Sequence, residues 1–252
     1  MSQIGCYHEP HELPKLVQNC HFLQKLSLAH LPLDLDDIQY ICENGQTLQV
    51  LDLEDCNIVL KNRTKLLQNL FTNCNHLTEL NMSARGNILL DQHIQALVDN
   101  LTPTILKVDL EYQCNFQDKH VKELVKRCNK LTHLGLMFTR ITNDSMHSII
   151  KHLNTSLEIL SVSKTKVEFA ALLELKSMPT LKTLICWFDI NNDENIKTLK
   201  LKLPHISISK ERCLFIASPI KRPFDQFLHI DEDWIWEIKA KRQDLLPRGG
   251  YY

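Results

Sequence analysis

The chain has 252 residues, of which 44% are hydrophobic and 23% are charged, and its formal net charge is −1. This composition is typical of a soluble globular protein and carries no basic surplus, so we expect neither nucleic acid nor a membrane as a partner. No run of 18 apolar residues predicts a membrane span, and nine cysteines without any Cys-x-x-Cys pair favour a reducing compartment, the nucleus or the cytoplasm.

The N-terminal segment carries little pattern. Residues 1–12 are expected to be irregular, and LPKLVQNC at 13–20 is expected to form a short helix before the first strand. Nothing before Leu23 resembles a polar cap over the end of a repeat stack. We therefore expect the sequence to be a fragment, an isoform or an incomplete gene model.

A short aliphatic motif, L-x-x-L-x-L, then recurs every 22 to 29 residues. This period is typical of leucine-rich repeats. Within each motif, alternation places the leucines of a short strand on one face and the intervening residues on the other. The eight matches are Leu23-Leu26-Leu28, Leu48-Leu51-Leu53, Leu77-Leu80-Met82, Ile105-Val108-Leu110, Leu131-Leu134-Leu136, Leu157-Leu160-Val162, Leu181-Leu184-Cys186 and Leu203-Ile206-Ile208.

Helical patterns lie between the strands, at 35–44, 63–74, 91–101, 117–128, 143–153, 168–178 and 194–203. Asp91, Asp118 and Asn143 stand where N-caps are expected. One strand and one helix cannot bury their apolar faces alone, but stacked repeats bury them jointly. The predicted fold is an α/β leucine-rich-repeat solenoid, a horseshoe with parallel strands on its concave face and helices on its convex face. It is expected over residues 13–210, as about seven repeats plus a terminal strand.

The cysteines follow the repeat. Cys20, Cys74 and Cys128 each stand three residues before a first leucine, and Cys56 stands three residues after Leu53. These thiols would lie whole repeats apart, so we expect small buried core residues and no metal site.

The strand face that points away from the helices is the predicted binding surface. It is acidic along the second to fourth strands and more apolar along the fifth to seventh, where an exposed apolar patch is expected. Either a partner or the chain's own tail would cover this patch. The candidate partner-binding residues are Asp52, Glu54, Glu79, Asn81, Asp109, Glu111, His133, Met137, Ile159, Ile185 and Trp187.

The repeat stops after Ile208, and residues 211–252 form a tail that includes Trp234 and Trp236. This segment is too aromatic for a disordered extension, so it is expected to cap the last repeat or to cross the concave face.

No catalytic motif or cofactor-binding loop occurs. HEPHE at 8–12 lacks the spacing of a metal-binding helix, and its proline interrupts any helix. Carboxylates such as Asp109 and Glu111 are expected to form a solvated, partner-facing acidic surface. Lys164 and Lys166, near Arg140, could meet a phosphate, although lone surface lysines are far more common. We predict a protein-binding chain, not an enzyme, with no cofactor.

Several motifs resemble a known family. The C-x-x-L-x-x-L-x-L arrangement and ITND at 141–144 are similar to the cysteine-containing repeats of F-box proteins. The segments LLELKSMPTLKTL (172–184), LKLPHISIS (201–209), FIASP (215–219) and IWEIKAK (235–241) resemble the S-phase kinase-associated F-box substrate receptors. The likeness spans about residues 13–241.

This resemblance implies the substrate-recognition subunit of a cullin–RING ubiquitin ligase that acts in cell-cycle control. Its substrates would include phosphorylated cyclin-dependent kinase inhibitors, and a small cyclin-kinase accessory subunit would dock toward the C-terminal repeats. A Skp-type adaptor would bind only if an F-box exists upstream, because the sequence as given shows none. The family's tail folds back across the concave face.

The sequence departs from the family at the positions that contact the accessory subunit. The expected tryptophan falls on Ala84, and the expected arginine and aspartate fall near Cys114 and Phe138. The alternative function is a stand-alone interaction scaffold, or a competitor that binds a substrate without delivering it to a ligase.

Overall fold

A computed structural model describes residues 2–5, 22–58, 64–85, 88–187 and 193–209. The chain divides into two units, Met1–Pro219 and Ile220–Tyr252, and all the described residues belong to the first. The helix predicted at 13–20 and the tail predicted from 211 fall outside these ranges. Within the ranges, every helix is too short or too polar to cross a lipid bilayer.

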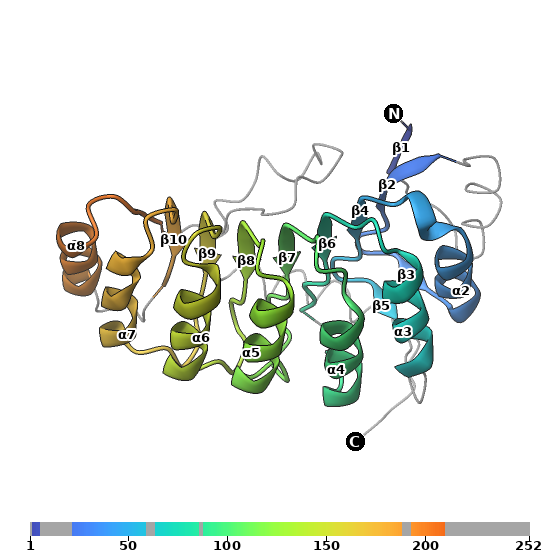
Figure 1. Cartoon of the computed structure of the whole chain (residues 1–252). Helices are drawn as coiled ribbons and strands as arrows, with labels where there is room; N and C mark the ends of the chain where they lie inside the picture. Colours follow the sequence, from blue (N-terminus) through green and yellow to red (C-terminus); the bar gives the residue numbers. More distant parts are fainter. Residues whose placement is uncertain (1, 6–21, 59–63, 86–87, 188–192, 210–252) are drawn as a thin grey trace, which may run out of the picture. The chain divides into compact units, whose positions relative to one another are not determined.

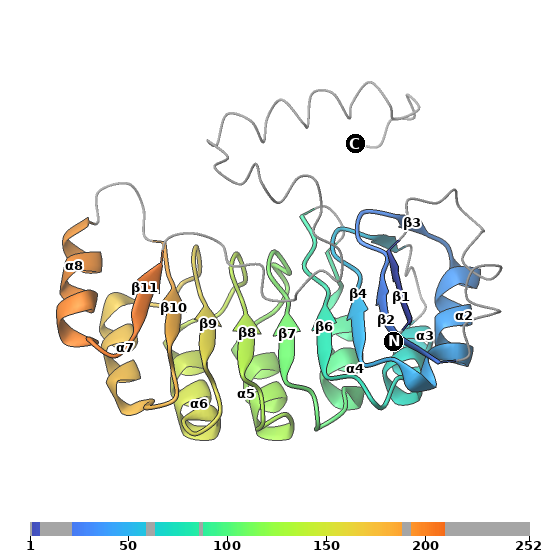
Figure 2. The ribbon, with the colours of Figure 1, turned by 90° about the horizontal axis from the view of Figure 1, so that it is seen from above.

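A nine-stranded parallel sheet organises the described residues, and its strands follow one another in chain order (Figures 1 and 2). All eight predicted strands are present, but the last lies two residues later than its motif predicts, because Leu184 pairs with Ile208 and not with Ile206. β1 adds an N-terminal strand where residues 1–12 were expected to be irregular. A separate parallel pair, β3 (Pro32–Leu33) and β5 (Asn57–Ile58), lies in the loops after two strands. The main sheet consists of β1 (Ser2–Gly5), β2 (Leu23–Ser27), β4 (Val50–Asp52), β6 (Glu79–Asn81), β7 (Lys107–Asp109), β8 (His133–Gly135), β9 (Ile159–Ser161), β10 (Thr183–Ile185) and β11 (Ser207–Ser209).

The helices cover one face of this sheet (Figure 1). Each lies where the sequence predicts a helix, with bounds that differ by a few residues. The sixth predicted helix is shorter than expected, because a 3-10 turn at Glu174–Ser177 replaces its second half. The helices are α2 (Leu35–Asn44), α3 (Thr64–Asn73), α4 (Asp91–Asn100), α5 (Asp118–Arg127), α6 (Asn143–Leu153), α7 (Phe169–Leu173) and α8 (Asp193–Lys202).

One aliphatic residue of each repeat forms a continuous ladder through the sheet, namely the central residue of the first seven motifs and Ile208 of the last. Leu134 on β8 pairs in register with Val108 on β7 and with Leu160 on β9, and all three side chains are fully buried. Parallel strands lie about 4.8 Å apart, so in-register side chains touch those of the next strand. Burying one leucine contributes about 1.5–3 kcal/mol, so the ladder makes a substantial contribution to stability.

Cysteines occupy small core positions between repeats, as predicted for Cys56, Cys74 and Cys128; Cys20 lies outside the described residues. The Cys56 thiol donates to the Leu28 carbonyl at 2.9 Å. Burial raises the pKa of both Cys74 and Cys128 to about 12, so these thiols stay protonated. Gly45 packs against Cys74 so closely that a β-carbon there would overlap the sulfur.

The first residues of three helices differ from the N-caps that the sequence predicts. Asp91, Asp118 and Asn143 are first helical residues and not N-caps; Leu90, Gln117 and Thr142 precede them. The error arises because these three side chains bond forward to the next repeat instead of capping their own helix.

These forward bonds link the start of one helix to the start of the next. Asp91 binds Lys119 Nζ at 2.8 Å. Asp118 accepts from the Thr142 amide and hydroxyl, both at 2.8 Å, and from Ser145 Oγ. Asn143 Oδ1 accepts from the Glu168 amide at 2.9 Å. The helices from α4 to α7 are therefore tied together at one end by side-chain bonds as well as by apolar packing.

Candidate functional site

The side chains on the strand face are more buried than the alternation of residues along each strand predicts. Asp52, Glu54, Asn81, Asp109 and Glu111 are all buried, which corrects the expectation of a solvated acidic surface. Side chains of neighbouring strands on this face are close enough to contact one another.

The predicted exposed apolar patch is also corrected. Ile185 is only 1% exposed and Met137 only 7% exposed, while Ile159 and Trp187 remain partly exposed. Ile185 is buried in a small apolar cluster against which Ile159 packs. The candidate residues that keep some exposure on this face are therefore Glu79, His133, Ile159 and Trp187.

The buried polar residues at the strand ends hold the backbone. The side-chain oxygens of Asp52, Asn81 and Asp109 each accept from the amide two residues further on, at 2.9–3.2 Å. Ser27 Oγ also donates to Asp52 at 2.7 Å. These carboxylates and amides therefore shape the turn after each strand.

Gly135 makes room for one of the acidic side chains. A β-carbon on Gly135 would lie 2.9 Å from the Asp109 carboxylate, so that carboxylate fills the space above β8. Glu111 reaches across the same rung, where its Oε1 accepts from Ser161 Oγ at 2.9 Å, and both residues are fully buried. The hydrogen bond thus joins the β7 and β9 repeats directly.

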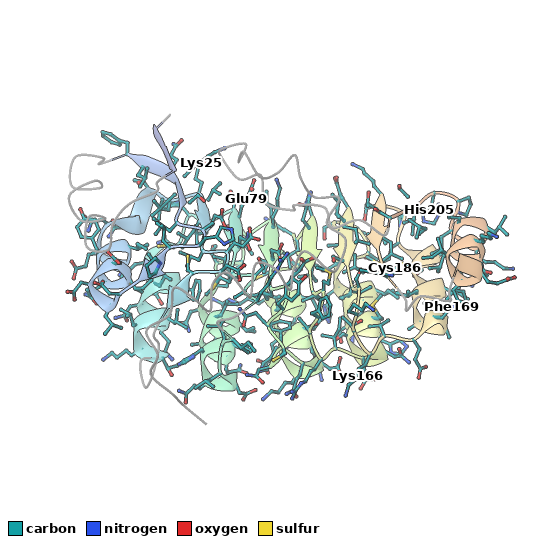
Figure 3. All side chains as sticks on the ribbon, turned by 180° about the vertical axis from the view of Figure 1, so that it is seen from behind. Lys25, Glu79, Lys166, Phe169, Cys186 and His205 are labelled. Atoms are coloured by element: carbon teal, nitrogen blue, oxygen red, sulfur yellow. The ribbon has the colours of Figure 1, made fainter. Side chains whose placement is uncertain are left out.

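At the edge where the strands begin, charges alternate along the sheet. Lys107 Nζ lies 3.0 Å from Glu79, and Lys182 Nζ lies 2.8 Å from Glu158. His133 lies between the two pairs, and burial together with Lys107 lowers the pKa of its imidazole. Figure 3 labels Glu79 near this edge and Lys166 near the opposite one.

A row of left-handed residues marks the edge where the strands end. We call it the strand-end row: His30, Asp55, Tyr112, Phe138 and Lys164, each two positions after the last aliphatic residue of its motif, with φ between 51° and 66°. Their amides bond to the next repeat, as when the Tyr112 amide donates to the Met137 carbonyl at 2.7 Å. Left-handed φ costs a non-glycine residue about 1–2 kcal/mol, and glycine avoids this cost. Bulky side chains kept at such positions point to a use for those side chains.

Side chains of this row contact their neighbours along the edge. The rings of Tyr112 and Phe138 stack with centroids 4.8 Å apart, and the Arg85 guanidinium lies 5.3 Å from the Tyr112 ring centroid. Lys164 Nζ lies 4.9 Å from the Trp187 ring centroid. Cation–π and stacked pairs of this kind add about 0.5–1.5 kcal/mol each at partly exposed sites.

The sequence interpretation missed most of this row. It noted Lys164 and its neighbours Lys166 and Arg140 only as isolated cations, and it singled out neither Tyr112 nor Phe138 for its side chain. A usable signal existed: the position two residues after each motif carries a large or charged side chain where the turn favours glycine.

The tail residues Trp234 and Trp236 lie outside the described part of the chain. Among the residues that the structure does describe, no cluster of three or more His, Cys, Asp or Glu side chains has the geometry to hold a metal ion.

Three solved structures are similar to the chain. A chain from the crystal structure of the Rad7 and Elc1 complex in yeast shares 18% identity with a TM-score of 0.59, over 85% of this chain and 58% of that one. The leiomodin-1 actin-binding site 2 shares 16% identity with a TM-score of 0.41, over 74% and 98% of the two chains. The leucine-rich-repeat protein LegL7 from Legionella pneumophila shares 16% with a TM-score of 0.42, over 71% and 63%.

The chain thus spans less than two thirds of the matched chains in the Rad7–Elc1 and LegL7 structures. The search of curated proteins found no match. The family model described as the SKP2 LRR domain matches residues 1–243. Parallel strands, alternating helices and this match establish a leucine-rich-repeat solenoid, and the chain belongs to the SKP2 LRR domain family.

Proposed function

We propose that the chain is the substrate-recognition domain of a cullin–RING ubiquitin ligase receptor that acts in cell-cycle control. The observation that carries this proposal is the match of the SKP2 LRR domain over residues 1–243, nearly the whole sequence. Leucine-rich-repeat domains are protein-interaction folds and are typically not enzymes. A chain of the Rad7–Elc1 complex, which has this fold, was crystallised with a protein partner.

The recognition surface would be the partly exposed part of the strand face. Glu79, His133, Ile159 and Trp187 present a carboxylate, an imidazole and two apolar groups along β6 to β10. The buried candidates Asp52, Glu54, Asn81, Asp109, Glu111, Met137 and Ile185 would act indirectly, by holding the turns and the face in shape.

The proposed substrate is a phosphorylated cyclin-dependent kinase inhibitor. A small cyclin-kinase accessory subunit would assist near Trp187, and Trp234 and Trp236 in the tail would also contribute to partner binding. The Skp-type adaptor would bind through an F-box upstream of these residues in a longer protein. The site of action would be the nucleus or the cytoplasm.

A reconstituted ubiquitin-transfer assay tests the proposal. The full chain is fused behind an F-box of the same family, assembled with adaptor, cullin and RING subunits, and given a phosphorylated kinase inhibitor with and without the accessory subunit. We expect ubiquitin transfer that requires the phosphate and decreases when Trp187→Ala and His133→Ala are combined.

The matched control is Lys122→Gln on the helix face, an exposed residue far from the strands, and it should transfer ubiquitin normally. An assembled ligase that neither binds nor modifies the substrate would contradict the proposal. If ubiquitin were transferred equally well to the unphosphorylated inhibitor, the proposed dependence on phosphate would be wrong.

A further inference from the structure

The edge where the strands end carries a compact group of cations and aromatic rings. We call it the strand-end strip: Arg85, Tyr112, Phe138, Arg140, Lys164 and Lys166. Phe138 is 41% exposed, and Arg85, Arg140 and Lys166 are exposed as well. These four exposed side chains carry the argument that follows.

The strip is continuous because the loops after successive strands are bonded to one another. The Arg140 amide donates to the Phe116 carbonyl at 2.9 Å, and the Lys166 amide donates to the Ile141 carbonyl at 3.0 Å. Arg140 and Lys166 therefore stand on adjacent repeats, each two residues beyond a member of the strand-end row. An exposed ring and two exposed cations therefore lie in the adjacent loops after β8 and β9.

Three acidic groups in the neighbouring loops make hydrogen bonds within the protein. Asp118 accepts hydrogen bonds from Thr142 and Ser145, and Glu168 Oε2 accepts from Asn143 Nδ2 at 2.9 Å. Asp55 Oδ1 accepts from the Arg85 amide at 2.5 Å. The strip thus presents positive charge beside an exposed aromatic ring.

We infer that the strand-end strip binds a short acidic peptide segment of another protein, with an aromatic residue as its anchor. The anchor would pack on the Phe138 ring, and the flanking carboxylates would meet Arg85, Arg140 and Lys166. Carboxylates pair well with guanidinium and ammonium groups, and aromatic side chains dominate peptide interfaces.

The size of the strip matches a short ligand. Arg85 and Lys166 belong to the repeats of β6 and β9, three strand spacings apart, or about 14 Å at about 4.8 Å per spacing. An extended peptide covers this length with about four to five residues. A long nucleic acid strand fits less well, because the chain has a net charge of −1 and the strip spans only about 14 Å.

The inference rests on the proposed function only in that the domain recognises other proteins, and it needs no ligase role. If the chain binds the peptide but fails in the ubiquitin-transfer assay, this inference is supported and the proposed function is contradicted. If the chain transfers ubiquitin but does not bind the peptide, only this inference is contradicted.

Fluorescence anisotropy with the full chain tests the inference. The probe is a fluorescein-labelled heptapeptide with a central tryptophan flanked on each side by three glutamates. We expect saturable binding that weakens as salt is raised, because exposed charges are screened. Phe138→Ala should lower the affinity at least about tenfold, as at other aromatic hot spots. The double variant of Arg140→Gln and Lys166→Gln should lower it about tenfold.

The matched control is the double variant of Lys122→Gln and Lys126→Gln on α5, which removes the same charge from exposed positions of the helix face. It should bind within about twofold of the unmodified chain, since its distant charges are largely screened. Probes with glutamine for glutamate, or with alanine for tryptophan, should bind weakly. Circular dichroism confirms that each variant is folded.

Three outcomes would overturn the inference. One is binding that is equal for both double variants. Another is tighter, Phe138-dependent binding of a labelled oligothymidylate, which would assign the strip to single-stranded nucleic acid. The third concerns residues 231–237 of this chain, DEDWIWE, which have the same chemistry. If the probe binds only when Asp231, Glu232 and Asp233 are changed to amides, the strip belongs to the chain's own tail.

Discussion

The two edges of the sheet are built from the same repeat but satisfy their charges differently. Where the strands begin, lysines lie beside carboxylates, as Lys107 does beside Glu79 and Lys182 beside Glu158. Where the strands end, cations lie over aromatic rings, as Arg85 does over Tyr112 and Lys164 over Trp187. The first edge is neutralised within the fold, while the second keeps positive charge available, supported by a strained backbone. The comparison indicates that the strand-end edge is the one suited to binding.

The largest expected loss of stability comes from a substitution in the aliphatic ladder, which supports both edges of the sheet. Leu134→Ala should lower the free energy of unfolding by about 2–5 kcal/mol, because it leaves a cavity in a fully buried site. Urea denaturation followed by circular dichroism measures this loss. Both edges should lose order together, and a loss below about 1 kcal/mol would show that the ladder is not the shared support.

Asp118 tests the bonds between helix starts on the strand-end side. Asp118→Asn should cost about 1–3 kcal/mol, since it weakens charge-assisted bonds to Thr142 and Ser145. Burial opposes ionisation of Asp118, but the bonds from Ser145 and Thr142 hold its pKa below the usual value. Its stabilisation is therefore present above the ordinary pKa of an aspartate and is lost as the pH falls through the lowered one. An unchanged urea midpoint in the variant at pH 7 would contradict this role.

Substitutions of Phe138 test whether the left-handed backbone of the strand-end row is strained. Phe138→Ala loses the ring stack with Tyr112 but keeps the left-handed backbone, whereas Phe138→Gly loses the stack and relieves the backbone. The glycine variant should therefore be more stable than the alanine variant by about 1 kcal/mol. Thermal and urea unfolding of the pair give the difference. Leu106, an exposed position without positive φ, serves as the control, where glycine should not be more stable than alanine.

His120 gives the smallest expected effect, a dependence on pH. Its Nδ1 accepts from the Gln117 amide at 3.1 Å, and burial lowers its pKa, with Lys119 acting in the same direction. The neutral ring is favoured in the folded state, so the stability that it contributes is present above about pH 6.5 and is lost as the pH falls below that value.

The test compares the chain with His120→Gln, whose amide oxygen can accept the same hydrogen bond. Between pH 7.5 and 5.5 the urea midpoint of the unmodified chain should fall more than that of the variant. Parallel curves for the two proteins would rule out a contribution from His120.

Much of the fold could be predicted from the sequence, because one period places the first seven residues of the ladder and every helix between strands. The last strand lies two residues later than predicted, where the spacing of the motif becomes irregular. The register of Leu51, Leu80 and Leu134 follows directly from the L-x-x-L-x-L spacing. The family resemblance, inferred from segments such as 201–209, agrees with the match to the SKP2 LRR domain.

The site could be predicted only in part. Alternation places Ile185 and Met137 on the correct face, but it cannot show that both side chains are buried there. The strand-end row escaped notice because no glycine marks its left-handed turns. Contacts such as that between Tyr112 and Phe138 join residues a whole repeat apart, and only the stacking of the repeats brings them together.

The hydrogen bond between Ser161 and Glu111 affects how the solenoid unfolds. Repeats usually interact only with their immediate neighbours, so unfolding can proceed one repeat at a time from an end. Glu111 reaches Ser161 two strands away, so the repeats of β7 and β9 share one buried hydrogen bond across β8. The segment from β7 to β9 should therefore exchange its amide hydrogens as a single cooperative block, slower than the repeats on either side.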